Sequence, residues 1–110
     1  MAAKTIDRQT VESAIAANAL IIDVREPSET ALGVIPTARL VPVGQMASAL
    51  ALDPAAFLQK FKFEMPLKDS PIIFYCRSGA RAGRACDDAV LAGFTNVANY
   101  KGSWNDWSAQ

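Results

Sequence analysis

The chain has 110 residues, of which 51% are hydrophobic and 20% are charged, a composition typical of one globular domain, here residues 1–110, with its own hydrophobic core. Its 11 basic and 11 acidic residues balance, so the sequence lacks the basic excess that is usual in proteins that bind nucleic acid or anionic membranes. It has two cysteines and no histidine, which leaves too few ligands for an ordinary zinc site and excludes a Cys–His or Ser–His catalytic pair.

Helical and strand-like patterns alternate along the first half of the sequence. Asp7 can cap a helix whose apolar side chains recur every three or four residues, at Val11, Ala14 and Ile15. The apolar run Leu20 to Val24 is typical of a strand that is buried on both faces of a parallel sheet. The segments that follow predict, in chain order, a loop, a second strand and a helix, at residues 33–38, 39–43 and 46–52.

The middle of the chain predicts another helix and another buried strand. Asp53 and Pro54 form a helix start, with an acidic cap and a proline at the first helical position, where no N–H is needed. We expect three residues to form the buried face of this helix: Phe57, Leu58 and Phe61. Residues 68–71 (KDSP) predict a turn, and residues 72–75 predict an entirely apolar strand.

The last third of the chain predicts a helix, a short strand and a closing aromatic segment. These cover residues 82–91, 95–98 and 100–107, and Gly93 is placed to end the helix. Buried strands that alternate with helices indicate an α/β domain with a mainly parallel sheet. Because sites in such sheets form at the carboxyl ends of the strands, Cys76, directly after an apolar run, is the first candidate for a functional residue.

Residues 74–81 (FYCRSGAR) can make a reactive thiol without a general base. If Cys76 ends a strand and a helix begins near Ala82, the chain must reverse direction in a few residues, and Gly79 permits the positive φ that this requires. Backbone N–H groups in such a loop point inward as an anion-binding nest, and the helix N-terminus adds partial positive charge. These settings lower a thiol pKa from about 8.5 by one to several units, so we expect Cys76 to be a thiolate nucleophile. Arg77 and Arg81 can bind a small oxyanion beside it.

The sequence resembles the single-domain rhodanese (thiosulfate sulfurtransferase) family in several segments that follow the family's order. IIDVREPSE at 21–29 is similar to its strand-end Asp-Val-Arg-Glu motif, and GVIPTA at 33–38 is a variant of its Gly-His-Ile-Pro-Gly-Ala. FYCRSGAR at 74–81 and, after GF at 93–94, NYKGSWNDW at 99–107 resemble its cysteine loop and its closing segment. The chain departs from the family pattern at three positions, where one histidine and two glycines are replaced by Val34, Thr37 and Ser103.

The resemblance implies a three-layer α/β domain, with about five mainly parallel strands flanked by helices. It implies that Cys76 takes the outer sulfur of thiosulfate, or of a persulfide donor, as a persulfide and passes it to cyanide or to a thiol, which can belong to a protein. The donor would be bound by the rest of the loop, namely Arg77, Ser78, Gly79, Ala80 and Arg81. No metal or organic cofactor is implied, and we expect neither nucleic acid nor a membrane as a partner.

Two other functions remain open on the sequence alone. Cysteine-dependent phosphatases and arsenate reductases also place a cysteine at the head of an anion-binding loop, but their cysteine and arginine enclose five residues, whereas Cys76 and Arg81 enclose four. A persulfide carrier that passes sulfur only to a partner protein would need the same loaded Cys76. Turnover with small donors distinguishes a carrier from an enzyme.

The remaining polar and thiol residues favour structural roles. Asp23 and Arg25 are expected to brace the loop or to pair with each other, and Arg84 to meet Asp88 at helical spacing. Cys86 falls on the apolar side of its helix and is expected in the core. The two tryptophans are expected to pack, although the resemblance places their segment near the pocket. The amino-terminal segment lacks the apolar stretch of a signal peptide, so we expect a cytoplasmic, reduced protein.

Overall fold

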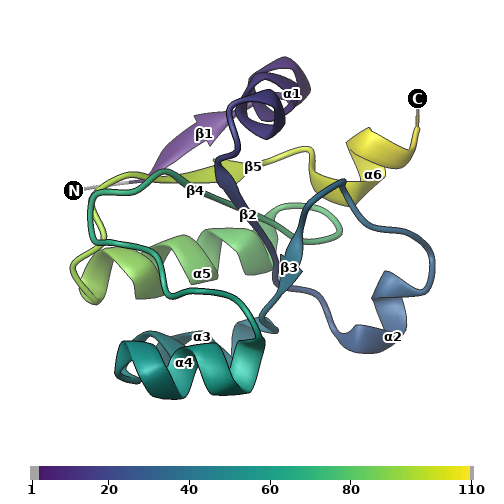
Figure 1. Cartoon of the computed structure of the whole chain (residues 1–110). Coiled ribbons are helices and arrows are strands. Elements are labelled where there is room, and N and C mark those ends of the chain that lie inside the picture. Colours follow the sequence, from purple (N-terminus) through teal and green to yellow (C-terminus); the bar gives the residue numbers. More distant parts are fainter. Residues whose placement is uncertain (1–2, 110) are drawn as a thin grey trace.

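A parallel β-sheet with helices on both faces is formed by residues 3–109, the part of the chain that the computed structural model describes (Figure 1). The five strands lie in the order β1-β5-β4-β2-β3, and every neighbouring pair is parallel. The strands are β1 (Lys4–Ile6), β2 (Leu20–Asp23), β3 (Arg39–Leu40), β4 (Ile72–Tyr75) and β5 (Val97–Tyr100). The helices are α1 (Arg8–Ala16), α2 (Pro27–Thr30), α3 (Val43–Leu50), α4 (Pro54–Phe61), α5 (Ala80–Leu91) and α6 (Ser103–Ser108). The expected α/β architecture is confirmed.

Two hydrophobic layers enclose the sheet, and β4 contributes to both. Ile72 and Phe74 pack with apolar side chains of α3, α4 and α5, whereas Ile73 and Tyr75 pack with those of α1 and α6. Figure 1 shows α3, α4 and α5 below the sheet and α1 and α6 above it. Because successive side chains of a strand point to opposite faces, a central strand covered on both faces is mostly apolar, and β4 is apolar throughout.

Local sequence signals explain where the predicted helix α4 begins and ends. The Asp53 side chain accepts a hydrogen bond from the Ala56 N–H at 2.8 Å, and Pro54 is the first helical residue. Lys62 ends the helix in a left-handed conformation, with φ of 67°. The prediction that Leu58 is buried is wrong, because its side chain is 46% exposed. Leu58 follows the buried Phe57 by one position and therefore points about 100° away around the helix.

Several predicted boundaries are wrong by two or more residues. The strand predicted at 39–43 ends at Leu40, and helix α3 spans Val43–Leu50, earlier than the predicted 46–52, since Pro42 acts as its N-cap residue. Helix α5 begins at Ala80, two residues before the predicted start. Strand β5 begins at Val97, and the predicted aromatic segment contains the end of β5 and helix α6. Neither β1 nor α2 was predicted.

The three central strands bring distant parts of the sequence together at one edge of the sheet. β2 and β5 both pair with β4, so the residues that follow Asp23, Tyr75 and Tyr100 emerge side by side. The Val24 N–H donates a hydrogen bond to the Tyr75 carbonyl at 2.9 Å, which holds the end of β2 against the end of β4. Cys76 therefore has chain segments on both sides.

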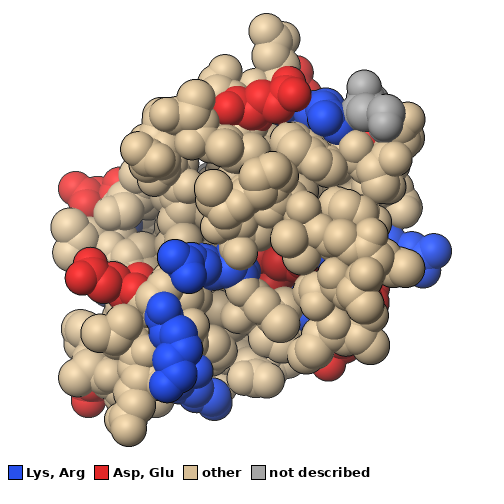
Figure 2. Space-filling model, turned by 45° about the vertical axis from the view of Figure 1, so that its right-hand side comes forward, with Lys and Arg blue, Asp and Glu red and all other residues tan. Residues whose placement is uncertain are grey.

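Charged side chains are dispersed over the surface. On the face that Figure 2 shows, most of the surface is uncharged, and the basic side chains form small separate groups. Among residues 3–109, no helix combines the length and apolarity needed to cross a bilayer. Within the same residues, no three side chains from His, Cys, Asp and Glu gather as a set of metal ligands.

Candidate active site

Cys76 is the first residue after β4, and the turn that follows wraps the backbone around its sulfur. The Gly79 N–H donates a hydrogen bond to Cys76 Sγ over 3.0 Å. Gly79 itself has φ of 101° and starts helix α5, so the left-handed glycine expected from the sequence is present. The Cys76 side chain is only 1% exposed, which favours reaction with a compact reagent.

The balance of burial and backbone hydrogen bonding favours the thiolate of Cys76. Burial alone raises the pKa of the thiol, because a charged sulfur loses its hydration. Four backbone N–H groups outweigh burial and lower the pKa below its ordinary value; they belong to Ala82, Gly79, Ser78 and Arg81. The loop thus lowers the pKa of its thiol with main-chain dipoles, and the sequence contains no histidine that could do so.

Helix α6 fixes the cysteine loop from the other side. The backbone N–H of Trp104 donates to the Cys76 carbonyl, and that of Asn105 donates to the Arg77 carbonyl, each over 3.0 Å. The Ser103 hydroxyl accepts a hydrogen bond from the Cys76 N–H over 3.1 Å. Consequently the backbone of the loop is held by a segment 27 residues away in the sequence. Sequence reasoning missed this contact, since it identifies Ser103 only as a departure from the family pattern.

Arg81 forms a bidentate ion pair with Glu29 of α2. Its two terminal nitrogens lie 2.6 and 2.9 Å from the two carboxylate oxygens. The Arg81 guanidinium and the Glu26 N–H hold the pKa of Glu29 at about 2, so Glu29 remains ionised at ordinary assay pH. The predicted role of Arg81 in donor binding therefore has a competitor, because a carboxylate already occupies the face that an oxyanion would use. Sequence reasoning assigned no role to Glu29; its only local signal was the proline-led start of α2.

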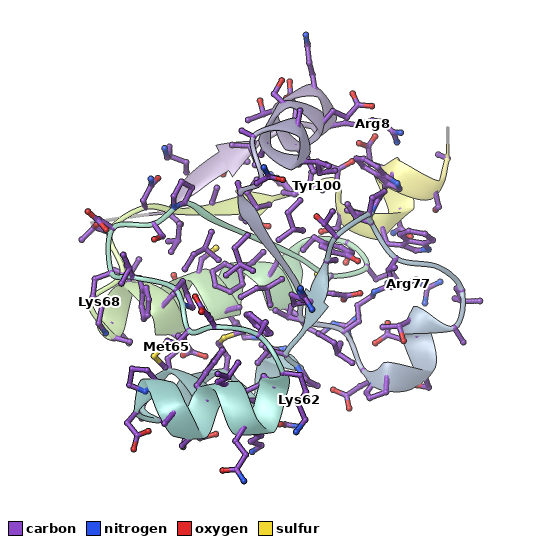
Figure 3. All side chains as sticks on the ribbon, viewed as in Figure 1. Arg8, Lys62, Met65, Lys68, Arg77 and Tyr100 are labelled. Carbon is purple, nitrogen blue, oxygen red and sulfur yellow. The ribbon has the colours of Figure 1, made fainter. Side chains whose placement is uncertain are left out.

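Three other loop residues predicted to bind the donor are exposed at the surface: Arg77, Ser78 and Ala80. Arg77 lies between α2 and α6 in Figure 3. Its guanidinium takes part in none of the ion pairs formed within residues 3–109. Arg77 is therefore the loop arginine whose charge remains uncompensated, and its role in binding a donor stays a prediction.

Asp23 and Arg25 form a buried ion pair beside the loop. The expectation that they pair with each other is therefore confirmed. Both residues are 1% exposed, and the closest guanidinium nitrogen lies 2.8 Å from the carboxylate. Arg25 also donates to the carbonyls of Glu29 and Gly33, at 3.3 and 2.8 Å. The Tyr75 hydroxyl donates to Asp23 over 2.9 Å. The pair therefore braces α2 and the following loop against the end of β4.

Comparison with known proteins identifies the family. Residues 7–110 match the family described as Rhodanese-like domain. The chain belongs to the rhodanese family. It is 36% identical over 107 residues to human thiosulfate:glutathione sulfurtransferase, covering 96% of this chain and 93% of that protein. The structure of the human single-domain sulfurtransferase TSTD1 matches this rhodanese with a TM-score of 0.93 and 34% identity, covering 98% and 97% of the two chains.

Some fungal relatives are longer than this rhodanese. It is 41% identical over 90 residues to the thiosulfate:glutathione sulfurtransferase of Saccharomyces cerevisiae, covering 82% of this chain and 65% of that protein. A Schizosaccharomyces pombe relative is 39% identical over 89 residues, and the chain spans 63% of its length. These matches show the family, and several of the matched relatives are named sulfurtransferases.

Two departures from the rhodanese pattern fall on unusual backbone. Thr37 and Ser103 stand where the family has glycine, and their φ angles are 70° and 54°. Both angles lie in the left-handed region that glycine adopts without a steric penalty. At both positions this rhodanese therefore holds a residue with a Cβ in a backbone conformation that glycine adopts more easily.

The two thiols of this rhodanese should differ sharply in reactivity. Burial, and secondarily the charge of Asp87, raises the pKa of Cys86 to about 12, whereas the pKa of Cys76 is lowered. We expect a small alkylating reagent at pH 7 to modify Cys76 and to leave Cys86 unmodified in the folded protein. Peptide mapping by mass spectrometry after timed quenching measures both rates. Equal labelling of the two cysteines would contradict the proposed activation.

Gly79→Ala should disrupt the loop of this rhodanese. An alanine Cβ would lie 2.5 Å from the Lys101 carbonyl oxygen, and φ at this position is 101°. We expect a loss of at least about 2 kcal/mol in the free energy of unfolding, together with slower alkylation of Cys76. Gly44→Ala is the matched control, because its Cβ meets no atom within 4 Å and the change should stabilise α3 by roughly 0–1 kcal/mol. Urea unfolding curves measure both, and equal stability of the two variants would contradict the clash.

Of the predictions for the residues around the site, those for Cys86 and the two tryptophans are confirmed and that for Arg84 is wrong. Cys86 is buried in the core, as expected. The expected pairing of Arg84 with Asp88 is wrong, since it is absent from the ion pairs of residues 3–109; at an exposed helical position water competes effectively for both charges. Both tryptophans pack, as predicted, and each lies against an arginine. The guanidinium carbon of Arg25 lies 5.0 Å from the ring centroid of Trp104, and that of Arg8 lies 4.0 Å from the ring centroid of Trp107.

Proposed function

We propose that this rhodanese transfers sulfane sulfur from thiosulfate to a small thiol through a persulfide on Cys76. The observation that supports this most directly is the contact between the Gly79 N–H and Cys76 Sγ, 3.0 Å long, within a loop whose amides favour an anionic sulfur. The reaction has two displacement steps at sulfur, and both use the same thiolate.

In the first step, the Cys76 thiolate attacks the outer sulfur of thiosulfate. A new S–S bond forms to Cys76, the S–S bond of thiosulfate breaks, and sulfite leaves with the bonding electron pair. The persulfide carries one negative charge, and sulfite carries the other two of the initial three. Because the terminal sulfur of the persulfide is still anionic, the same backbone N–H groups stabilise the reactant and the intermediate.

In the second step, the thiolate of the acceptor attacks the terminal sulfur of the persulfide. The Cys76 thiolate leaves, and the acceptor becomes a persulfide, so the protein returns to its starting state. A thiol acceptor is supported by the human and Saccharomyces cerevisiae relatives that are named thiosulfate:glutathione sulfurtransferase. Cyanide can take the sulfur in the same way, with thiocyanate as the product.

The contacts of Arg81 are a reason against a phosphatase reaction. Glu29 holds both terminal nitrogens of Arg81, so this guanidinium does not present its paired donors to a phosphate above the thiol. Cys76 and Arg81 also enclose four residues, one fewer than in the phosphatase signature. A short loop that surrounds one sulfur agrees better with transfer of a sulfur atom.

Intact-mass spectrometry tests the persulfide directly. The reduced protein is exposed to thiosulfate, desalted and compared with Cys76→Ser and Cys86→Ala variants treated in parallel. We expect the wild-type and Cys86→Ala proteins to gain the mass of one sulfur atom, which is lost again on addition of glutathione, and the Cys76→Ser protein to gain none. An unchanged wild-type mass, or sulfur retained in Cys76→Ser, would contradict the proposal. Steady-state turnover with thiosulfate and glutathione alone would distinguish an enzyme from a carrier that needs a partner protein.

Arg77→Ala should weaken the use of thiosulfate. Arg77 is the exposed loop arginine outside the ion pairs of residues 3–109, so its charge is available to a dianionic donor. Loss of one charge-assisted hydrogen bond, about 1.5 kcal/mol, should raise the KM for thiosulfate roughly tenfold. Arg84→Ala is the matched control, because Arg84 is also an exposed arginine and lies in helix α5, directly after the loop. Initial-rate kinetics measure both variants, and the same KM for each would remove Arg77 from donor binding.

A further inference from the structure

Ser103 is a fully buried polar residue that lies at the junction of two strand ends. Its side chain is 0% exposed, and it is the first residue of α6. The backbone at Ser103 has φ of 54°, a left-handed conformation that a residue with a Cβ resists. Strained backbone at a buried residue persists only where surrounding contacts compensate for it, so the contacts of the hydroxyl are informative.

The hydroxyl of Ser103 joins the ends of β4 and β5. It donates a hydrogen bond to the Tyr100 carbonyl over 2.7 Å and accepts one from the Cys76 N–H over 3.1 Å. Its oxygen also lies 4.0 Å from Cys76 Sγ. A hydroxyl has a single proton, which is directed at Tyr100, so the oxygen acts on Cys76 as an acceptor. Ser103 thus fixes the main chain of the nucleophile.

We propose that Ser103 is a positioning residue for Cys76, which holds the Cys76 N–H so that the sulfur stays within the amide nest of its loop. The proposal rests on the proposed function, in which Cys76 carries the sulfur. Ser103 is not placed to react itself, because its oxygen is buried, its single proton is donated to the Tyr100 carbonyl and it already accepts a hydrogen bond from the Cys76 N–H. Its effect passes through the geometry of Cys76.

The physical reason is the cost of an unpaired backbone N–H in the protein interior. Without the Ser103 oxygen, the Cys76 N–H would lose its acceptor in a buried environment, and the backbone would shift toward another one. Such a shift would move Cys76 Sγ relative to the Gly79 nitrogen, which lies 3.0 Å from it, and relative to the other N–H groups of the loop. Loss of this alignment weakens the hydrogen bonds that favour the thiolate.

Two substitutions separate the hydroxyl from the backbone conformation. Ser103→Ala removes the oxygen and keeps the strained φ, whereas Ser103→Gly removes the oxygen and relieves the strain. Thr37→Gly is the matched control. Thr37 is an exposed residue with φ of 70°, so this substitution relieves the same kind of backbone strain and removes no hydrogen bond to Cys76. Melting temperature is recorded for each variant, so that the comparison uses folded protein.

The decisive measurement is the rate of iodoacetamide alkylation of Cys76 as a function of pH, which does not depend on sulfur transfer. We expect the apparent thiol pKa to rise by about one unit in both Ser103 variants, with an alkylation rate at pH 7 about tenfold lower than in the wild type and in Thr37→Gly. Ser103→Thr, which keeps a hydroxyl, should recover part of the rate. A Ser103→Gly protein that melts like the wild type and is alkylated with an unchanged pH profile would overturn the proposal.

The same data distinguish this inference from the proposed function. If the wild-type protein acquires no sulfur from thiosulfate but the alkylation profile still shifts in the Ser103 variants, then the proposed function fails and the positioning role stands. If the wild-type protein is loaded with sulfur and the Ser103 variants match it in both alkylation and transfer, then the proposed function stands and the positioning role fails.

Discussion

Cys76→Ser should abolish sulfur transfer and leave the fold intact. Serine has nearly the same shape, but its hydroxyl does not ionise at assay pH, and the sequence contains no histidine to deprotonate it. Since loss of a nucleophile removes the covalent route altogether, we expect the transfer rate to fall by more than about a thousandfold. Thiocyanate formation from thiosulfate and cyanide measures the rate, and circular dichroism during heating measures the fold.

Cys86→Ala is the control for that experiment. Cys86 is buried in the hydrophobic core, and its raised pKa keeps it neutral, so its replacement should cost some stability and leave sulfur transfer in place. A Cys76→Ser protein that forms thiocyanate at the native rate would show that another residue accepts the sulfur. Loss of transfer in both variants, with both folded, would mean that the two thiols act together.

Asp23→Ala should destabilise the protein more than any exposed charge substitution. Asp23 and Arg25 are buried, and removing the carboxylate leaves the Arg25 guanidinium without its counter-ion in the interior. Breaking such a pair costs about 3–5 kcal/mol, which for a domain of this size lowers the melting temperature by roughly 15–25 °C. The Tyr75 hydroxyl loses its acceptor at the same time. Calorimetry measures the shift.

An exposed ion pair provides the comparison. Arg8 and Glu12 lie 3.5 Å apart at the surface of α1, so Glu12→Gln should change stability by less than about 0.5 kcal/mol. Replacing both buried partners, Asp23→Leu with Arg25→Met, should restore much of the melting temperature, because no charge is then left unpaired. We expect sulfur transfer to be impaired in this double variant even when it is stable. Arg25 also donates hydrogen bonds to the carbonyls of Glu29 and Gly33, and methionine cannot replace these bonds. An Asp23→Ala protein that melts within a few degrees of the wild type would contradict this account.

The sequence predicts buried strands more reliably than exposed ones. β4 has the predicted bounds, and β2 ends at Asp23, one residue before the predicted end, because strands covered on both faces admit few polar side chains. β1 has only three residues, two of them exposed, and lies at the edge of the sheet, so no apolar run marks it. The single turn α2 is equally hard to predict, because its four residues include none that is buried.

The candidate site shows the same division between local and long-range information. The thiol, the left-handed glycine and the converging backbone N–H groups of residues 76–82 all follow from one short segment, and all were predicted. The pairing of Arg81 with Glu29 joins positions that are 52 residues apart, and Ser103 meets Cys76 across 27 residues. Such contacts depend on the order of the strands in the sheet. The sequence therefore indicates which residues can react or bind. It does not indicate which of their hydrogen-bond donors are already paired with another side chain, as those of Arg81 are with Glu29.

The hydrogen bonds from α6 to the cysteine loop have a consequence for biosynthesis. The carbonyls of Cys76 and Arg77 are capped by the N–H groups of Trp104 and Asn105, which the ribosome adds almost thirty positions later. A nascent polypeptide therefore lacks these two hydrogen bonds until residues 104 and 105 have been added and α6 has docked against the loop. The complete set of contacts around Cys76 forms only when nearly the whole domain has been synthesised.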